Sequence, residues 1–140
     1  EYLLGVATGE GMPLINVLVD ANNLASLQSA LPISIFDAEL LTDDVTIRFG
    51  RPGEKYVFNS AGHEMDLEGL PVVCRGDEPV GNAVKDSMTC KVHAATRSVV
   101  GVVYGSSVGG THDPAAAAQA LGSLLARYAG ALEVTALGAP

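Results

Sequence analysis

The sequence predicts an α+β domain in which several short strands pack with two or three helices. Residues 45–49 alternate between apolar and polar side chains, as in a half-buried strand. Residues 99–104 are nearly all apolar, which is typical of a strand covered on both faces. The clearest helix lies near the C-terminus, where Asp113 suits the N-cap, Pro114 the first helical position and Gly130 the position just past the end.

The first third of the chain predicts two helices joined by a short extended segment. Residues 1–8 read as the tail of a helix that ends at a glycine. Residues 14–19 are apolar and partly β-branched, which predicts a short strand or an extended entry. Asp20 is the expected N-cap of a second helix over residues 21–30, and Pro32 stops that helix.

A β-hairpin is predicted in the middle of the chain. The alternation places Val45, Ile47 and Phe49 on one face of the first strand, which we expect to face the core. Pro52-Gly53 suits a tight turn, and residues 55–59 suit the returning strand of the hairpin.

The remaining segments give weaker signals. Residues 60–69 are polar and punctuated by glycine, which predicts irregular structure. Residues 70–75 are a strand candidate, and residues 77–91 are expected to be irregular with one short helix. Residues 132–135 are a candidate final strand. No internal repeat and no linker interrupts the 140 residues, so one domain over 1–140 is the prediction.

Composition and charge exclude several classes of protein. An apolar content of 48% with 17% charged residues indicates a folded chain rather than a disordered one. The net charge of -8 argues against a broad nucleic-acid surface, because lysine and arginine supply the attraction to phosphate. No apolar stretch is long enough to predict a membrane span, and we expect a cytoplasmic protein. Because residue 1 is Glu rather than Met, we expect an N-terminal portion to be missing.

Cysteines and histidines predict no metal site. Cys74 and Cys90 lack metal or redox spacing; two buried reduced thiols are the expectation, and a disulfide is the alternative. The three histidines have no partner four residues away, so no zinc pattern is present. We expect no metal and no cofactor.

Three polar segments are candidates for function. Residues 105–109 match the Gly-x-Ser-x-Gly pattern, but the following helix starts too late for a nucleophile elbow, so a flexible loop is favoured. A cluster that contains positive charge could contact a carboxylate, a phosphate or a sugar, or be a solvated loop; it comprises Lys85-Asp86-Ser87, Lys91 and His93. The third segment holds Asp20, Asn22 and Asn23, of which capping alone explains only Asp20.

A series of short matches carries a family resemblance. These matches are Val19-Asp20, Asn23, Pro32, Phe36-Asp37 and Gly53-Glu54. At these spacings the region from about Pro13 to Tyr104 resembles the B3/4 domain of the bacterial phenylalanyl-tRNA synthetase β subunit, and still more the freestanding B3/4 proteins related to it. The segment Val84-Lys85-Asp86-Ser87, with Lys91-Val92 and Thr96, is similar to a subgroup of the freestanding proteins.

The resemblance implies a site and an activity. The synthetase domain hydrolyses wrong amino acids from tRNA, so the chain is expected to be an aminoacyl-tRNA deacylase acting in trans. The implied catalytic residues are Ser34, Lys85 and Asp86; the implied substrate-binding residues are Asp20, Asn23, Asn82, Ala83, Ser87 and Val102. The expected partner is the 3′ end of an aminoacyl-tRNA or a free amino acid.

Two departures from the family pattern bear on that activity. Ser34 stands where the family has a histidine, which puts hydrolysis in question. Val102 stands near the position of a glutamate that recognises the tyrosine hydroxyl, so a preference for tyrosine is not expected. Three alternatives therefore stay open: a non-catalytic amino-acid-binding module, a tRNA-independent enzyme that modifies an amino acid, and, more remotely, a serine hydrolase using Ser107.

Overall fold

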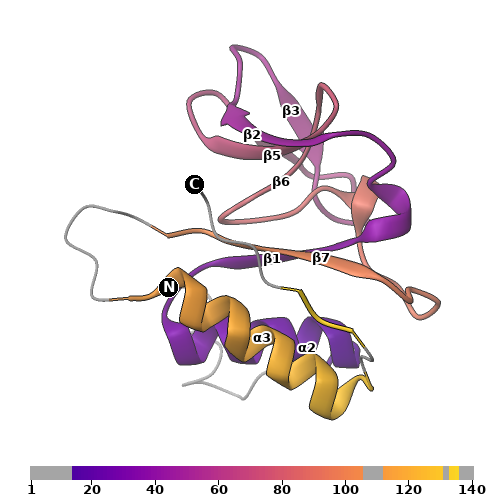
Figure 1. The fold of residues 1–140 in the computed structure, drawn as a ribbon. Coiled ribbons are helices and arrows are strands. Elements are labelled where there is room, and N and C mark those ends of the chain that lie inside the picture. Colours follow the sequence, from indigo (N-terminus) through magenta and orange to yellow (C-terminus); the bar gives the residue numbers. More distant parts are fainter. Residues whose placement is uncertain (1–13, 106–111, 131–132, 136–140) are drawn as a thin grey trace. The chain divides into compact units, whose positions relative to one another are not determined.

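A computed structural model describes residues 14–105, 112–130 and 133–135 (Figure 1). The chain divides into two compact units, of which one comprises Glu1–Ile33 and Val102–Pro140 and the other comprises Ser34–Gly101. The expected helix over residues 1–8 lies outside the described residues, and so do residues 106–110 of the glycine-rich run that begins at Gly105. No helix in the described ranges is long and apolar enough to cross a membrane.

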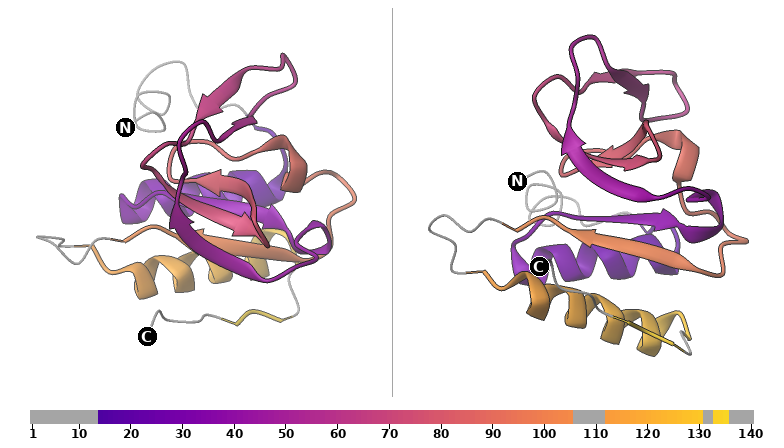
Figure 2. Two further views of the ribbon diagram at one scale, coloured as in Figure 1. Left: turned by 90° about the horizontal axis from the view of Figure 1, so that it is seen from above. Right: turned by 45° about the horizontal axis from the view of Figure 1, so that its top comes forward.

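The first unit is built on two helices, α2 (Val17–Ser29) and α3 (Pro114–Tyr128), which lie side by side (Figure 1, Figure 2). The predicted caps of α3 are confirmed, since the Asp113 carboxylate accepts from the Ala115 N–H at 2.9 Å and Gly130 has a positive φ of 68°. Residues 133–135, by contrast, form no strand.

The start of α2 differs from the prediction. Asn16 is the N-cap, and its Oδ1 accepts from the Leu18 and Val19 N–H groups at 3.1 and 3.0 Å. Asp20 lies inside the first turn, where its negative charge still favours the helix N-terminus. The expected strand or extended entry over residues 14–19 is therefore wrong for its second half, because an asparagine cap earlier in the chain starts the helix.

The second unit is mainly antiparallel β-structure. β2 (Val45–Phe49), β5 (Pro71–Arg75) and β6 (Glu78–Asn82) form a three-stranded sheet in the order β2-β5-β6. β3 (Lys55–Val57) pairs with β4 (Glu64–Asp66). The predicted hairpin is therefore wrong in its pairing, because β2 pairs with β5 and not with β3. The segments 64–66 and 78–82 form strands, although the sequence predicts irregular structure there.

The exposed face of β2 is also the reverse of the prediction. Val45, Ile47 and Phe49 are exposed, and Phe49 leaves 70% of its surface accessible. Arg48 lies opposite the fully buried Val72 of β5, and residues opposite each other share a face of the sheet. Alternation defines two faces of a strand, but it does not decide which of them the core covers.

Two further strands, β1 (Ile33–Asp37) and β7 (Val99–Val103), pair with each other, and the boundary between the units crosses both. The second unit also holds two single-turn 3₁₀ helices, η1 (Ala38–Leu40) and η2 (Met88–Cys90). Its core is a cluster of Tyr56, Leu67, Val72 and Cys74, with Phe58 and Met65 packed against it. Cys74 and Cys90 are both free and fully buried, which confirms the expectation of reduced thiols.

Candidate functional site

The second unit contains a hydroxyl–carboxyl pair formed by the buried Ser34 and the half-buried Asp86. Ser34 lies in β1 and is only 4% exposed. Its Oγ lies 2.7 Å from Asp86 Oδ1 and 3.2 Å from the backbone carbonyl oxygen of Asn82. Two of the three residues expected to be catalytic are thus in direct contact, although 52 positions separate them in the sequence.

The loop that carries Asp86 is shaped by the side chain at its start. The Asn82 Oδ1 accepts from the N–H groups of Val84 and Lys85 at 2.8 and 3.0 Å, which turns the chain at the end of β6. Ser87 closes the loop, because its N–H donates to the Val80 carbonyl oxygen at 2.9 Å. The Ser87 hydroxyl then caps η2. Asn82 and Ser87, expected to bind substrate, are therefore residues that hold the loop in shape.

A tyrosine and a glycine fix the position of the carboxyl. The Tyr56 hydroxyl donates to the Lys85 carbonyl oxygen at 2.5 Å, which ties the loop to β3. A Cβ placed on Gly81 would lie 2.5 Å from both Asp86 Oδ1 and Cζ of the fully buried Phe36. Only glycine leaves room here for the ring and the carboxyl together.

Burial raises the pKa of the Asp86 carboxyl from 3.8 to about 6. The Ser34 hydroxyl, the Lys91 charge and a backbone hydrogen bond with Asn82 act in the opposite direction. Ser34 has one hydroxyl proton and two acceptors nearby, so it cannot donate to both at once. If Asp86 is protonated, it can donate to the Ser34 oxygen while the Ser34 hydroxyl donates to the Asn82 carbonyl oxygen, so both hydrogen bonds form at once. The pair can therefore take up and release a proton near neutral pH, as a general base requires.

Two lysines of the predicted cluster meet at Phe58. The Lys85 ammonium lies 3.9 Å from the centroid of the Phe58 ring, and the Lys91 ammonium donates to the Phe58 carbonyl oxygen at 2.9 Å. Ala83, also expected to bind substrate, is exposed in the same loop. Sequence reasoning missed Tyr56 and Phe58, whose signal was only that of core-facing aromatic residues on a predicted strand.

His93 belongs to a different cluster from the one predicted. Its Nε2 lies 3.3 Å from Oδ2 of Asp37, a carboxylate that is 2% exposed. The Thr96 hydroxyl donates to the same oxygen at 2.5 Å, and the Glu39 N–H donates to Oδ1 at 2.9 Å. Asp37 therefore joins the end of β1 to the segment before β7, which is a structural role.

Glu54 likewise has a structural role. Its two carboxylate oxygens each lie 2.7 Å from a nitrogen of the Arg48 guanidinium, in a bidentate pair. The Arg51 N–H donates to Glu54 at 2.6 Å. Hydrogen bonding to Arg48, and then to the Arg51 backbone, lowers the pKa of the Glu54 carboxyl from 4.5 to about 2.

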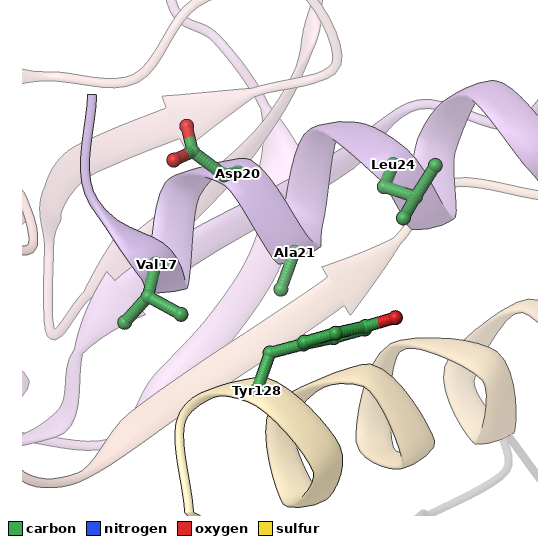
Figure 3. A pocket seen from close by; sticks show the side chains of 5 residues that line it. All are labelled: Val17, Asp20, Ala21, Leu24 and Tyr128. Carbon is green, nitrogen blue, oxygen red and sulfur yellow. The ribbon is translucent and has the colours of Figure 1, made fainter. Parts of the chain in front are cut away.

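The other expected site residues lie in the first unit. Asp20 and Asn23 are on α2, and Val102 is in β7. Asp20 lines an apolar hollow of about 340 Å³, shown in Figure 3, whose other walls are Val17, Ala21, Leu24 and Tyr128. The Asp20 Oδ1 already accepts from the Ile15 N–H at 3.0 Å.

Asn22 is the more deeply placed of the two asparagines on α2. It is 6% exposed, and its Nδ2 donates to the Ile33 carbonyl oxygen at 2.9 Å. Its Oδ1 has no hydrogen-bond partner among the described residues. Asn23 is half-buried. Of the adjacent pair, Asn22 therefore forms the polar link between α2 and the start of β1. Within the described ranges, no group of three or more His, Cys, Asp or Glu residues is placed to hold a metal ion.

Comparison with known proteins gives two matches. The family described as the B3/4 domain matches residues 5–108. A phenylalanine–tRNA ligase β subunit from Nitrobacter winogradskyi is 41% identical over 54 residues, which are 39% of this chain and 7% of that protein. The chain thus spans only a small part of that relative, whereas the family match covers most of the chain. The chain belongs to the B3/4 domain family.

Proposed function

We propose that this B3/4 chain hydrolyses the ester bond between an amino acid and the 3′ end of tRNA. The observation that carries the proposal is the contact between Ser34 and Asp86, with the pKa of the carboxyl raised to about 6. A base with that pKa is mostly ionised at pH 7.5 and can still accept a proton. The similarity to a subunit named phenylalanine–tRNA ligase supports an amino acid attached to tRNA as the substrate class.

In the proposed reaction, the ionised Asp86 removes a proton from a water molecule as the water oxygen attacks the ester carbonyl carbon. The tetrahedral intermediate then collapses, and the bond from that carbon to the terminal ribose oxygen breaks. The ribose oxygen receives the proton from Asp86, so the products are the free amino acid and tRNA with a free hydroxyl. Asp86 acts as base in the first step and as acid in the second.

Water is a better nucleophile here than Ser34. Ser34 is 4% exposed, and its Oγ already lies within hydrogen-bond distance of Asp86 Oδ1 and of the Asn82 carbonyl oxygen. We assign Ser34 the role of a positioning residue, because its hydrogen bond sets the direction of the Asp86 carboxyl. This role fits a position where the family resemblance implies a histidine, since hydroxyl and imidazole can both hydrogen-bond a carboxyl.

The test is deacylation of a pooled set of aminoacyl-tRNAs by the wild type, Asp86→Asn and Ser34→Ala. We expect release of one or a few amino acids, a loss of at least about 100-fold in Asp86→Asn and a smaller loss in Ser34→Ala. Because the pKa of Asp86 is raised from 3.8 to about 6 in the folded chain, its ionisation lowers the stability as the pH rises through that range, and the loss is complete at pH 7.5. Asp86→Asn, which carries no charge, should therefore melt no lower than the wild type at pH 7.5. Equal melting temperatures with unequal rates separate catalysis from unfolding. Full activity in Asp86→Asn would refute the role of the carboxyl.

The second candidate is a binding module that holds an aminoacyl group without cleaving it. Ser34 stands where the family resemblance implies a histidine, and this departure, together with the net charge of -8, favours the binding module. A rise in melting temperature with one aminoacyl ester or free amino acid, with no product from any ester, would select this candidate over the deacylase. Chemical change of a free amino acid without tRNA would instead select a biosynthetic enzyme.

A further inference from the structure

Lys85 and Lys91 form a small cationic site beside the loop that carries Asp86. The Lys85 ammonium lies over the Phe58 ring at 3.9 Å, and the Lys91 ammonium is bonded to the Phe58 carbonyl oxygen at 2.9 Å and lies 3.5 Å from Met88 Sδ. One aromatic residue therefore holds both cations, one by its ring and the other by its backbone. Both lysines are exposed to solvent.

The two ammonium groups differ from most of the other cations of the second unit. Four of those cations are bound to carboxylates: Arg48 to Glu54, Arg51 to Asp77, Lys55 to Glu64 and Arg75 to Glu78. Neither Lys85 nor Lys91 has a carboxylate within 4 Å among the described residues. Their charge is thus available to an anion from outside, in a chain whose net charge of -8 repels anions elsewhere.

Each lysine is also held in place before any ligand arrives. Contact with the ring restricts the long Lys85 side chain, whose free rotation would otherwise oppose binding. Lys91 is close enough to Asp86 for its charge to act on that carboxyl. The cationic site and the proposed base therefore lie within electrostatic reach of each other.

We propose that Lys85 and Lys91 bind a phosphate group of the tRNA acceptor end, while the aminoacyl ester lies at Asp86. This inference rests on the proposed function. An aminoacyl ester has no free carboxylate, so the nearest anions of such a substrate are the phosphodiesters of the terminal nucleotides. A local pair of lysines also supplies the positive charge that the rest of this acidic chain lacks. That charge matters because phosphate contacts dominate affinity for nucleic acid.

The experiment measures binding of an uncharged RNA oligonucleotide ending in CCA to Lys85→Gln, Lys91→Gln and the double variant. Lys55→Gln is the matched control, since it removes one charge from a lysine paired with Glu64. We expect the double variant to bind about tenfold more weakly and with a reduced salt dependence, and Lys55→Gln to bind within about twofold of the wild type.

Equal weakening by Lys55→Gln would overturn the proposal, because net charge alone would then explain the effect. Loss of binding to a free amino acid, with binding to RNA unchanged, would overturn it in favour of a carboxylate site. The proposed function is tested separately with an aminoacyl ester of adenosine, which carries no phosphate. If the wild type cleaves that ester, the proposed function stands even where the lysine variants bind RNA as tightly as the wild type does, and only the phosphate site is then overturned. If the wild type cleaves no ester, the deacylase fails, and RNA binding still decides the role of the lysines.

Discussion

Replacing Gly81 with alanine tests whether the packing of Phe36 against β6 positions the Asp86 carboxyl. The new methyl group would lie 2.5 Å from Phe36 Cζ and 2.5 Å from Asp86 Oδ1. Ordinary contact begins at 3.4 Å, so each neighbour would have to move by about 0.9 Å. The Phe36 ring is fully buried and has little room to yield, whereas the carboxyl belongs to a loop. We therefore expect the carboxyl to move more than the ring.

The expected cost is that of overpacking a core, roughly 1–3 kcal/mol, which corresponds to a fall of about 3–12 °C in Tm. Displacing Asp86 from Ser34 should also break the hydrogen bond on which the proposed site depends. We therefore expect hydrolysis or ligand binding to be lost even at temperatures where the variant is fully folded. Thermal unfolding and the chemical shift of the Asp86 carboxyl carbon measure the two effects separately.

Gly62→Ala is the control for this substitution. Gly62 has a φ of 79° and nothing within 4 Å of a built Cβ, so alanine there adds backbone strain without touching the site. It should lower Tm and leave the titration of Asp86 unchanged. A Gly81→Ala variant with the Tm and the Asp86 titration of the wild type would refute the packing argument.

Two further predictions concern stability. Arg48 holds the pKa of Glu54 at about 2, so the pairing of Glu54 contributes stability above pH 4.5 that is lost as the pH falls towards 2. Between pH 5 and 2.5, the Tm of Glu54→Gln should therefore fall less steeply than the Tm of the wild type. Parallel curves would contradict this. Ala30 caps the C-terminus of α2 with a φ of 54°, a conformation that glycine adopts without strain; Ala30→Gly should raise the stability by about 0.5–1 kcal/mol in urea unfolding, and an unchanged or lower midpoint would contradict this.

Local signals in the sequence identify an element well where a residue type strongly prefers one position in that element. Asp113, Pro114 and Gly130 have well-defined positions at helix ends, and α3 begins and ends where they predict. The strands β2, β5 and β7 were also recognised from their apolar patterns.

Pairing and burial were beyond the reach of those local signals. The strand at Lys55–Val57 follows β2 closely, yet it pairs with β4, because the tertiary fold and not the turn decides the partner of a strand. The exposure of Ile47 and Phe49 depends on which side of β2 the core lies. The alternation of side chains along the strand does not contain that information.

The candidate site shows the same division. The family motif led to Ser34, Asn82 and Asp86, which the structure brings into contact. It could not reveal that Tyr56 ties down the same loop, because that bond joins residues 29 positions apart through a backbone carbonyl. Nor could it show that Asp37 and Glu54 serve the scaffold, since a matched residue type does not distinguish a buried hydrogen-bond network from a binding site.

The most direct test of the account is the rate of deacylation as a function of pH for the wild type and Asp86→Asn. If Asp86 is the base, the wild-type rate rises with pH, reaches half of its plateau near pH 6 and then levels off, because the ionised carboxyl is the active form. The variant should show only a low rate without that step. The same step in Asp86→Asn, or no amino acid released from any aminoacyl-tRNA by the wild type, would contradict the central claim.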